Sequence, residues 1–266
     1  MNSFSEIRMI VTDLDRTLLR SDKSLSDFTA EILLRCRAHG IKVVFATARS
    51  EASAQRFTDA IQPDAVISNG GALARSDGKT IYDCPLPAAT ANRLLRRCAA
   101  DSGVGWITIE TVTEYLVNHP IDPADSGWLD YRHARPVDFT RETIGPAYKI
   151  VIACADERRV RTIADAFPDV DLLRFAGEDW FRLAHRKATK WAAVQAVSAH
   201  FGVPISAVAA FGDDYNDVEM LRGCGFGVAV ANAIPEAKAA AKFACGSNDA
   251  DGVAQWLTEQ GIAFSI

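Results

Sequence analysis

Short apolar runs alternate with amphipathic segments over the first 70 residues. The apolar runs lie at 9–11, 41–46 and 65–67, and Ser26 and Ser50 can cap the two helices expected between them. Strand, helix, strand, helix, strand in this order requires parallel strands, because each helix returns the chain to the edge where the previous strand began. The pattern therefore predicts an α/β fold with an open, mostly parallel, Rossmann-like sheet.

The last 80 residues return to this alternation. We expect a helix over 189–201, strands over 208–211 and 226–230, and a terminal helix over 253–260. The first of these helices is predicted to carry Trp191, Val194, Val197 and Phe201 on one face. The two ends of the chain are thus predicted to contribute to one core.

The middle of the chain has a different pattern. It opens at Pro85, and its expected strands and helices no longer alternate one by one. A chain of 266 residues is long enough for two domains. We predict a Rossmann-like core formed by residues 1–84 and 186–266, with an inserted α+β cap domain over 85–185.

Composition excludes several classes of protein. The formal net charge is -5, so the chain has no overall positive field for nucleic acid. No apolar run approaches the roughly 20 residues of a membrane span, and no secretory leader is visible. Its six cysteines are widely spaced, which is typical of free thiols. We expect a cytoplasmic protein without nucleic-acid or membrane partners; the oligomeric state is not indicated.

Two carboxylates follow the first predicted strand. Asp13 and Asp15 are separated by one residue, and their like charges repel. A divalent cation relieves this repulsion, and hard oxygen ligands suit Mg²⁺. The alternative is that one aspartate caps the next turn and the other is solvated.

A second acidic loop follows the strand predicted at 208–211. Asp213, Asp214 and Asp217 lie within five residues, which favours a cation over an ordinary surface turn. Lys190 could supply positive charge to this site, although a helical lysine is usually solvated. Thr47 follows another strand and could bind a phosphate oxygen, or it could simply end that strand.

These loops occur in an order that resembles the four motifs of the haloacid dehalogenase-like hydrolase superfamily. The matching residues are Asp13-Leu14-Asp15-Arg16-Thr17, Thr47, Lys190 and Gly212-Asp213-Asp214-Tyr215-Asn216-Asp217. Ser68-Asn69-Gly70-Gly71 and Val228-Ala229-Val230-Ala231-Asn232-Ala233 are also similar to the Cof-type phosphatases of subclass IIB. The resemblance covers essentially the whole chain.

This resemblance implies a phosphatase that uses Mg²⁺ and acts on small phosphorylated metabolites, such as sugar phosphates. It makes Asp13 the nucleophile, which forms an aspartyl-phosphate, and Asp15 the general acid and base. The implied magnesium ligands are Asp13, Asp213 and the backbone carbonyl of Asp15, with Asp217 supporting the metal or Lys190. The residues implied to bind the phosphoryl group or the substrate are Thr47, Lys190, Asn216 and Asn69.

Three positions depart from the family pattern. Arg16, Ala48 and Trp191 stand where glycine is usual. None of these changes removes a catalytic group. Arg16 could reach the leaving group of the substrate or narrow the entrance to the site.

Other functions share parts of this pattern. A phosphomutase of the same superfamily uses the same aspartyl chemistry, and the core does not separate it from a phosphatase. A signalling receiver phosphorylated on aspartate is shorter and has no inserted cap. Dehalogenation needs neither the metal nor a carboxylate at Asp15, and four intact motifs argue against a non-catalytic binding scaffold.

An irregular stretch of the predicted cap could contact the substrate. Its candidate residues are Trp128, Tyr131, Arg132, His133 and Arg135. They could equally cover the surface of the cap itself, so the physiological substrate is left open.

Overall fold

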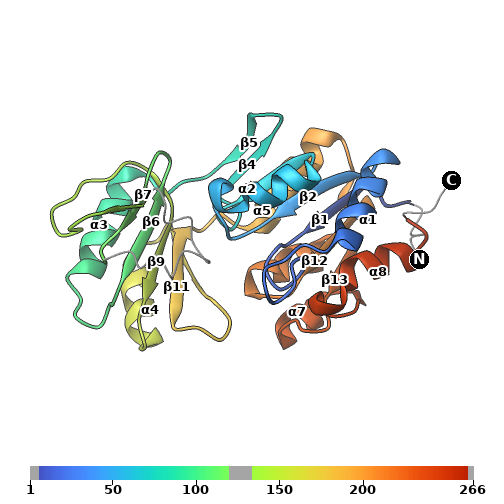
Figure 1. Cartoon of the computed structure of the whole chain (residues 1–266). Coiled ribbons are helices and arrows are strands. Elements are labelled where there is room, and N and C mark those ends of the chain that lie inside the picture. Colours follow the sequence, from blue (N-terminus) through green and yellow to red (C-terminus); the bar gives the residue numbers. More distant parts are fainter. Residues whose placement is uncertain (1–5, 120–133, 263–266) are drawn as a thin grey trace. The chain divides into compact units, whose positions relative to one another are not determined.

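The computed structural model describes residues 6–119 and 134–262 of the chain. It divides into two compact units (Figure 1). Unit 1 comprises Met1–Tyr82 and Thr189–Ile266, and unit 2 comprises Asp83–Ala188. Unit 2 is therefore an insertion in the sequence of unit 1. Its limits lie two residues before and three residues after those predicted for the cap.

Unit 1 is built on an eight-stranded sheet. The strand order is β14-β13-β12-β1-β2-β3-β4-β5, and the neighbours from β14 to β3 are parallel. The bounds are β1 Met9–Thr12, β2 Lys42–Ala46, β3 Ala65–Ser68, β4 Leu73–Ser76, β5 Lys79–Asp83, β12 Val208–Gly212, β13 Phe226–Ala229 and β14 Phe243–Ala244. The prediction of an α/β fold with a mostly parallel sheet is confirmed.

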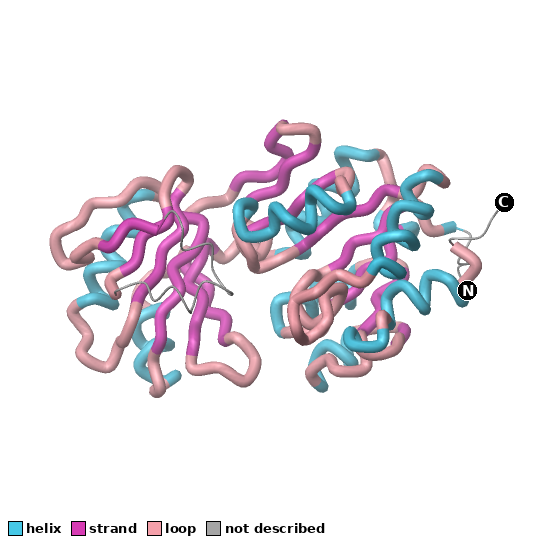
Figure 2. Tube along the Cα trace, viewed as in Figure 1, coloured by secondary structure: helices cyan, strands magenta, loops and turns pink. Residues whose placement is uncertain are grey.

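Helices cover both faces of this sheet (Figures 1 and 2). One apolar cluster joins the sheet to α1, α2, α7 and α8, and a second joins its other face to α5 and α6. Ser26 and Ser50 cap α1 and α2 as predicted, by accepting bonds from backbone N–H groups. The bounds are α1 Asp27–Ala38, α2 Glu51–Ile61, α5 Lys190–Phe201, α6 Val218–Gly223, α7 Pro235–Ala240 and α8 Gly252–Glu259.

The apolar face predicted for α5 packs against the sheet of unit 1. Val194 and Val197 are buried in one apolar cluster, and Trp191 and Phe201 are half-buried against the same cluster. Lys190, Ala193 and Ser198 are buried as well. The side chain of Lys190 reaches carboxylate partners, so this helix buries a charged residue beside its apolar ones.

Unit 2 has a six-stranded sheet in the order β10-β11-β9-β6-β7-β8, with antiparallel neighbours from β10 to β7. Its own apolar cluster lies between the sheet and two helices. The bounds are β6 Ile107–Thr111, β7 Tyr115–Val117, β8 Ala134–Pro136, β9 Ala147–Ala153, β10 Val170–Arg174, β11 Trp180–His185, α3 Ala88–Ala99 and α4 Glu157–Asp165.

Of the cap residues proposed as substrate contacts, only Arg135 is described; Trp128, Tyr131, Arg132 and His133 lie outside the described residues. The Arg135 guanidinium forms exposed ion pairs with Glu114 and Glu142 on unit 2 itself.

None of the described helices is long and apolar enough to cross a membrane. All six cysteines are free thiols. The cytoplasmic location stays a prediction.

Candidate active site

Two acidic loops meet at the carboxyl ends of β1 and β12. These strands are parallel neighbours, and Thr12 is paired with Phe211. One residue further on, the backbone N–H of Asp13 donates to the Phe211 carbonyl at 3.0 Å. The register therefore brings Asp13 and Asp213 to one edge of the sheet, where both are buried. Ligand sites in open α/β sheets form at this edge.

Lys190 joins the two loops. It is the first residue of α5, whose N-cap Thr189 accepts a bond from the backbone of the first turn. Its side chain is 2% exposed, and Nζ lies 2.6 Å from Oδ1 of Asp13 and 2.6 Å from Oδ1 of Asp217. Burial would lower the pKa of Lys190, but the charges of Asp13 and Asp217 outweigh it and raise that pKa. The lysine is therefore a permanent buried cation.

Gly71 allows the turn after β3 to pack against the start of α5. A Cβ atom at this position would lie 2.1 Å from the carbonyl carbon of Thr189, closer than any real contact. Its φ of 102° is also unfavourable for residues with a side chain. The turn of residues 68–71 is thus fixed beside Lys190.

The three buried carboxylates fit a metal ion. Carboxylate oxygens of Asp13, Asp213 and Asp217 lie within 4.8 Å of one another. Burial and the charge of Asp217 raise the pKa of Asp213 to about 7. Burial also raises the pKa of Asp13; Lys190 opposes this effect, and Asp217 and Asp213 add to it. A divalent cation stabilises the ionised forms, and an all-oxygen donor set suits Mg²⁺.

Asp217 is anchored by its own loop. Oδ2 accepts bonds from the backbone N–H groups of Asp213 at 3.0 Å and Asp214 at 3.1 Å, while Oδ1 accepts from Lys190. Gly212 leaves room for this arrangement, since a Cβ there would lie 2.4 Å from the Cβ of Asp217. Asp217 therefore orients Lys190 and shapes the loop.

Asp15 is not part of the three-carboxylate cluster and is held by two cations. Arg49 donates two bonds to its carboxylate at 2.7 and 2.8 Å, and Lys23 donates one at 3.0 Å. Burial alone would raise the pKa of Asp15, but these hydrogen bonds and charges outweigh it and hold that pKa below its usual value. Asp15 is ionised in this arrangement, and the role predicted for its backbone carbonyl stays a prediction.

The predicted phosphate-binding residues occupy the same edge of the sheet or the loops that follow it. Thr47 is buried directly after β2, and its hydroxyl accepts a bond from the N–H of Arg49 at 3.1 Å. Asn69 is buried in the turn after β3, with a φ of 54°. Asn216 lies in the acidic loop, and its Nδ2 is buried without a hydrogen-bond partner among the described residues.

Sequence reasoning missed several residues that shape the site. The Thr17 hydroxyl donates to Asp213 at 2.8 Å, and its place in the first motif was the available signal. Arg49 was visible two residues after Thr47, but nothing in the sequence linked it to Asp15. Lys23 carried no signal, because a lysine in a polar loop is usually solvated.

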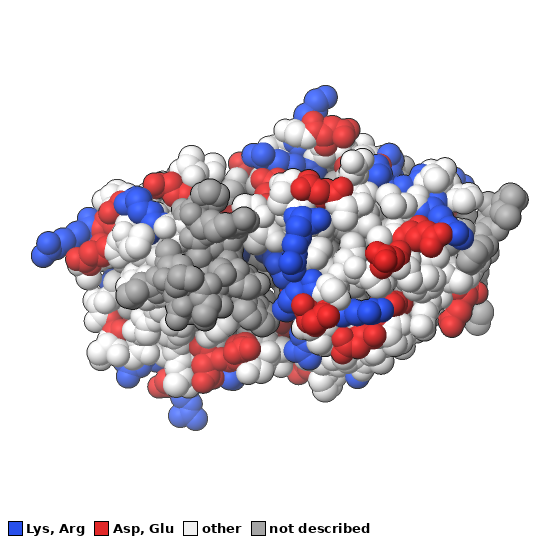
Figure 3. Space-filling view, viewed as in Figure 1, with Lys and Arg blue, Asp and Glu red and all other residues white. Residues whose placement is uncertain are grey.

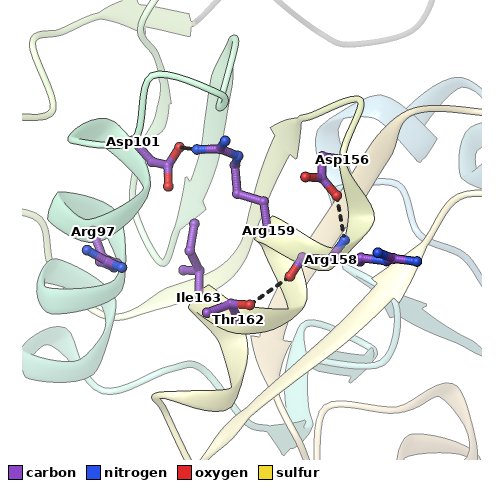
Figure 4. Close-up of a pocket in the computed structure, with 7 residues that line it drawn as sticks. All are labelled: Arg97, Asp101, Asp156, Arg158, Arg159, Thr162 and Ile163. Atoms are coloured by element: carbon purple, nitrogen blue, oxygen red, sulfur yellow. Dashed lines mark hydrogen bonds and ion pairs between the residues drawn. The ribbon is translucent and has the colours of Figure 1, made fainter.

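A separate hollow lies in unit 2 beside α3 and α4 (Figure 4). Both of its aspartates are engaged: Arg159 donates to Asp101 at 2.6 Å, and Asp156 caps α4. The lining residues are Arg97, Asp101, Asp156, Arg158, Arg159, Thr162 and Ile163. They include neither a nucleophile paired with a base nor a metal-binding set, so the hollow has no chemistry of its own.

Known proteins resemble the chain over nearly its whole length. The uracil phosphatase YitU of Bacillus subtilis (strain 168), which acts on 5-amino-6-(5-phospho-D-ribitylamino)uracil, is 29% identical over 263 residues, 94% of this chain and 96% of the relative. Pyridoxal phosphate phosphatase YbhA of Escherichia coli (strain K12) is 26% identical over 277 residues, 94% and 97% of the two chains. Among solved structures, the subclass IIB sugar phosphatase BT4131 matches with a TM-score of 0.84 and 22% identity, covering 96% and 99%.

The family model described as haloacid dehalogenase-like hydrolase matches residues 10–257. The resemblance inferred from the four motifs is thereby confirmed, and the solved structure has the same fold. The chain therefore belongs to the haloacid dehalogenase-like hydrolase family, as a phosphoric monoester hydrolase.

Proposed function

We propose that the chain is a magnesium-dependent phosphatase that hydrolyses small phosphorylated metabolites, such as sugar phosphates, through an aspartyl-phosphate on Asp13. The observation that carries this proposal is the buried Lys190, held 2.6 Å from both Asp13 and Asp217 beside Asp213. One fixed cation beside three carboxylates leaves negative charge to be neutralised, which suits a metal ion and a phosphoryl group bound together.

Asp13 attacks the phosphorus, and the bond to the leaving oxygen breaks as an acyl phosphate forms on the carboxylate. Water then attacks this acyl phosphate and releases inorganic phosphate, which restores Asp13. Dividing the reaction in this way replaces one difficult step by two easier ones. Lys190 and Thr47 hold the phosphoryl oxygens, and Asn216 adds a buried N–H donor.

Mg²⁺ would be held by Asp13 and Asp213, with the backbone carbonyl of Asp15 and the carboxylate of Asp217 in support. When bound, it neutralises carboxylate and phosphoryl charge, so that an anionic nucleophile can approach an anionic ester. The raised pKa values of Asp13 and Asp213 support this assignment, because they show how unfavourable the ionised cluster is on its own.

Asp15 moves the protons of both steps. It gives a proton to the leaving oxygen in the first step and takes one from the attacking water in the second. Bound to Arg49 and Lys23, it is ionised and suited to the second step. To act as the acid it must carry a proton, so we expect its contacts with Arg49 and Lys23 to loosen when substrate binds.

Unit 2 would act as a cap that selects among substrates. It is inserted between the two segments of unit 1 that supply all the residues of the chemical step. Relatives with names for different substrates, a ribitylaminouracil phosphate and pyridoxal phosphate, match across both units. Chemistry in unit 1 and selection in unit 2 would account for one fold with several substrates.

Metal removal tests the proposed function. Chelator-treated protein should release almost no phosphate from p-nitrophenyl phosphate, and added Mg²⁺ should restore the activity. Equal phosphate release with and without metal would contradict the proposal.

Two variants test the covalent intermediate. Asp13→Asn cannot form the acyl phosphate and should lose turnover. Asp15→Asn keeps the nucleophile but lacks both the acid and the base. With p-nitrophenyl phosphate, whose leaving group departs without a proton, the first step should still proceed, so an aspartyl-phosphate on Asp13 should accumulate and be detected by mass spectrometry after rapid quenching. Asp165→Asn, an exposed position on α4, is the matched control and should behave as the unmodified protein. Phosphate on any residue other than Asp13 would refute the mechanism.

A further inference from the structure

Arg16 has a strained backbone next to the proposed acid–base residue. Its φ of 62° lies in the left-handed region, which is unfavourable for a residue with a Cβ atom. Glycine would adopt this conformation without strain. An arginine held in a strained conformation directly after Asp15 points to a use for its side chain.

The surrounding loop enforces this conformation. Asn232 donates from Nδ2 to the carbonyl of Arg16 at 2.7 Å, and the N–H of Asn248 fixes Asn232 through its Oδ1 at 3.0 Å. On the other side, the Thr17 hydroxyl is bound to Asp213. The backbone of Arg16 is thus held on both sides, so its side chain leaves the loop from a fixed point.

The Arg16 guanidinium is available to a ligand. The residue is exposed, and no described residue forms a hydrogen bond or ion pair with its side chain. This distinguishes it from Arg49 and Lys23, whose cationic groups are bound to Asp15. Figure 3 shows Lys and Arg side chains interspersed with Asp and Glu on the visible face of unit 1.

The position of Asp15 indicates which part of the substrate Arg16 meets. Asp15 gives its proton to the leaving-group oxygen, so the groups around Asp15 face the leaving group rather than the transferred phosphoryl group. Arg49, Lys23 and Arg56 lie there, with Arg56 donating to the carbonyl of Lys23 at 3.0 Å. Arg16 directly follows Asp15 in the chain, and the single carboxylate of Asp15 does not neutralise the cations of this loop region.

We infer that Arg16 is a specificity residue, and that the preferred substrates are phosphate monoesters whose leaving group carries a second anion, either a carboxylate or a phosphate. This inference rests on the proposed function, because it takes the role of Asp15 from it. A guanidinium pairs with both anions through two parallel N–H bonds. The anion binds Arg16 while the reacting phosphoryl group lies at Lys190 and Asp13.

Matched substrate pairs test the inference. 3-Phosphoglycerate carries a carboxylate where glycerol 3-phosphate has a hydroxymethyl group, and fructose 1,6-bisphosphate carries a phosphate that fructose 6-phosphate lacks. The unmodified protein should have a higher kcat/KM for the anionic member of at least one pair. Arg16→Gln should reduce the substrate ratio, which is kcat/KM for the anionic member divided by kcat/KM for its partner, by about tenfold to hundredfold. This is the contribution expected of a charge-assisted pair. Arg16→Lys should keep part of it.

Strain supplies a second readout. Arg16→Gly should raise the urea midpoint of unfolding while it lowers the substrate ratio. Asp77→Gly is the matched control, because Asp77 also has a positive φ, 48°, but lies in the turn between β4 and β5. It should raise stability without changing the ratio. A purely structural role for Arg16 would leave the ratio unchanged.

The outcomes separate this inference from the proposed function. If the unmodified protein releases no phosphate from p-nitrophenyl phosphate in the presence of Mg²⁺, the phosphatase proposal itself is refuted. Activity without preference for the anionic member of either pair would overturn the inference alone. So would a preference that survives in Arg16→Gln.

Discussion

The two sheets of this protein bury their side chains in different ways. In unit 1 every residue of β1 and of β12 is buried, because helices cover both faces of the sheet. In unit 2 only one face carries the apolar cluster. Its strand β9 places Ile150 and Ile152 in that cluster, with Lys149 and Val151 at the alternate positions.

The opposite face of the unit 2 sheet carries polar side chains. Thr108 and Arg182 are both paired in register with Val151, so they lie in one row across three strands. Beside this row, Lys149 is paired with Glu110, and their side chains approach to 3.6 Å. Thr108, Lys149 and Arg182 are nevertheless buried, so these polar groups are paired or covered rather than open to solvent. A sheet that is apolar on both faces can offer polar groups only at its strand ends, and we therefore expect the chemistry at the edge of the unit 1 sheet and substrate selection in unit 2.

Removing unit 2 should have the largest effect on this division. Cys84 Sγ lies 3.3 Å from His185 Nδ1, so a short linker between these residues can replace residues 85–184. Among the described residues, no apolar cluster draws on both units, so unit 1 should remain folded. We expect p-nitrophenyl phosphate to be hydrolysed slowly, while kcat/KM differences among natural esters shrink by roughly a hundredfold or more. Circular dichroism checks the fold, and an unchanged substrate ranking would show that unit 2 does not select.

A glycine-to-alanine substitution should affect kcat and stability at the crowded edge of the unit 1 sheet but not in an open loop of unit 2. Gly212→Ala places a Cβ against Asp217 and should displace the partner of Lys190. We expect about a hundredfold loss of kcat and a destabilisation of about 1–3 kcal/mol. Gly145→Ala has no atom within 4 Å of the new Cβ and serves as the control. Equal kinetics and urea midpoints for the two variants would contradict this account of Gly212.

The smallest effect is expected at the amino ends of the unit 1 strands. Asp64 accepts bonds from Lys42, Arg37 and the N–H of Val43. Burial alone would raise the pKa of Asp64, but these partners hold it below its usual value. A carboxyl whose folded pKa is lowered stabilises the fold above its unfolded pKa of about 3.9, and this contribution is lost as pH falls through the folded pKa.

Asp64→Asn should therefore lower the free energy of unfolding by about 1 kcal/mol at pH 7, with no change in kcat. The difference from the unmodified protein should shrink as the pH is lowered below about 4. Urea titrations at several pH values measure it. A difference that is constant with pH would mean that the charge of Asp64 does not contribute.

The sequence alone was enough to predict the helices and strands of unit 1 discussed here and the chemical groups in its motifs. The apolar period and the capping serines predicted α1, α2 and the parallel strands, because these depend on neighbours within a few residues. Asp13, Asp15, Lys190 and Asp213 could be named because motifs keep order and spacing. Periodicity alone ranks side chains by hydrophobicity and would leave a helical lysine in solvent; the resemblance to the family motifs, not the period, pointed to Lys190, which the structure buries.

Only the tertiary structure decided which charges meet. The sequence separates Asp13 from Lys190 by 177 residues and Asp15 from Arg49 by 34, and no local rule pairs them. The pairs form because the register of β1 with β12 brings distant loops to one edge, where burial makes every charge require a partner. The positive φ of Arg16 also depends on a contact between residues distant in the sequence, since Asn232 binds its carbonyl from 216 residues away. Sequence determined the elements and the chemical groups, and the fold decided which of those groups act together.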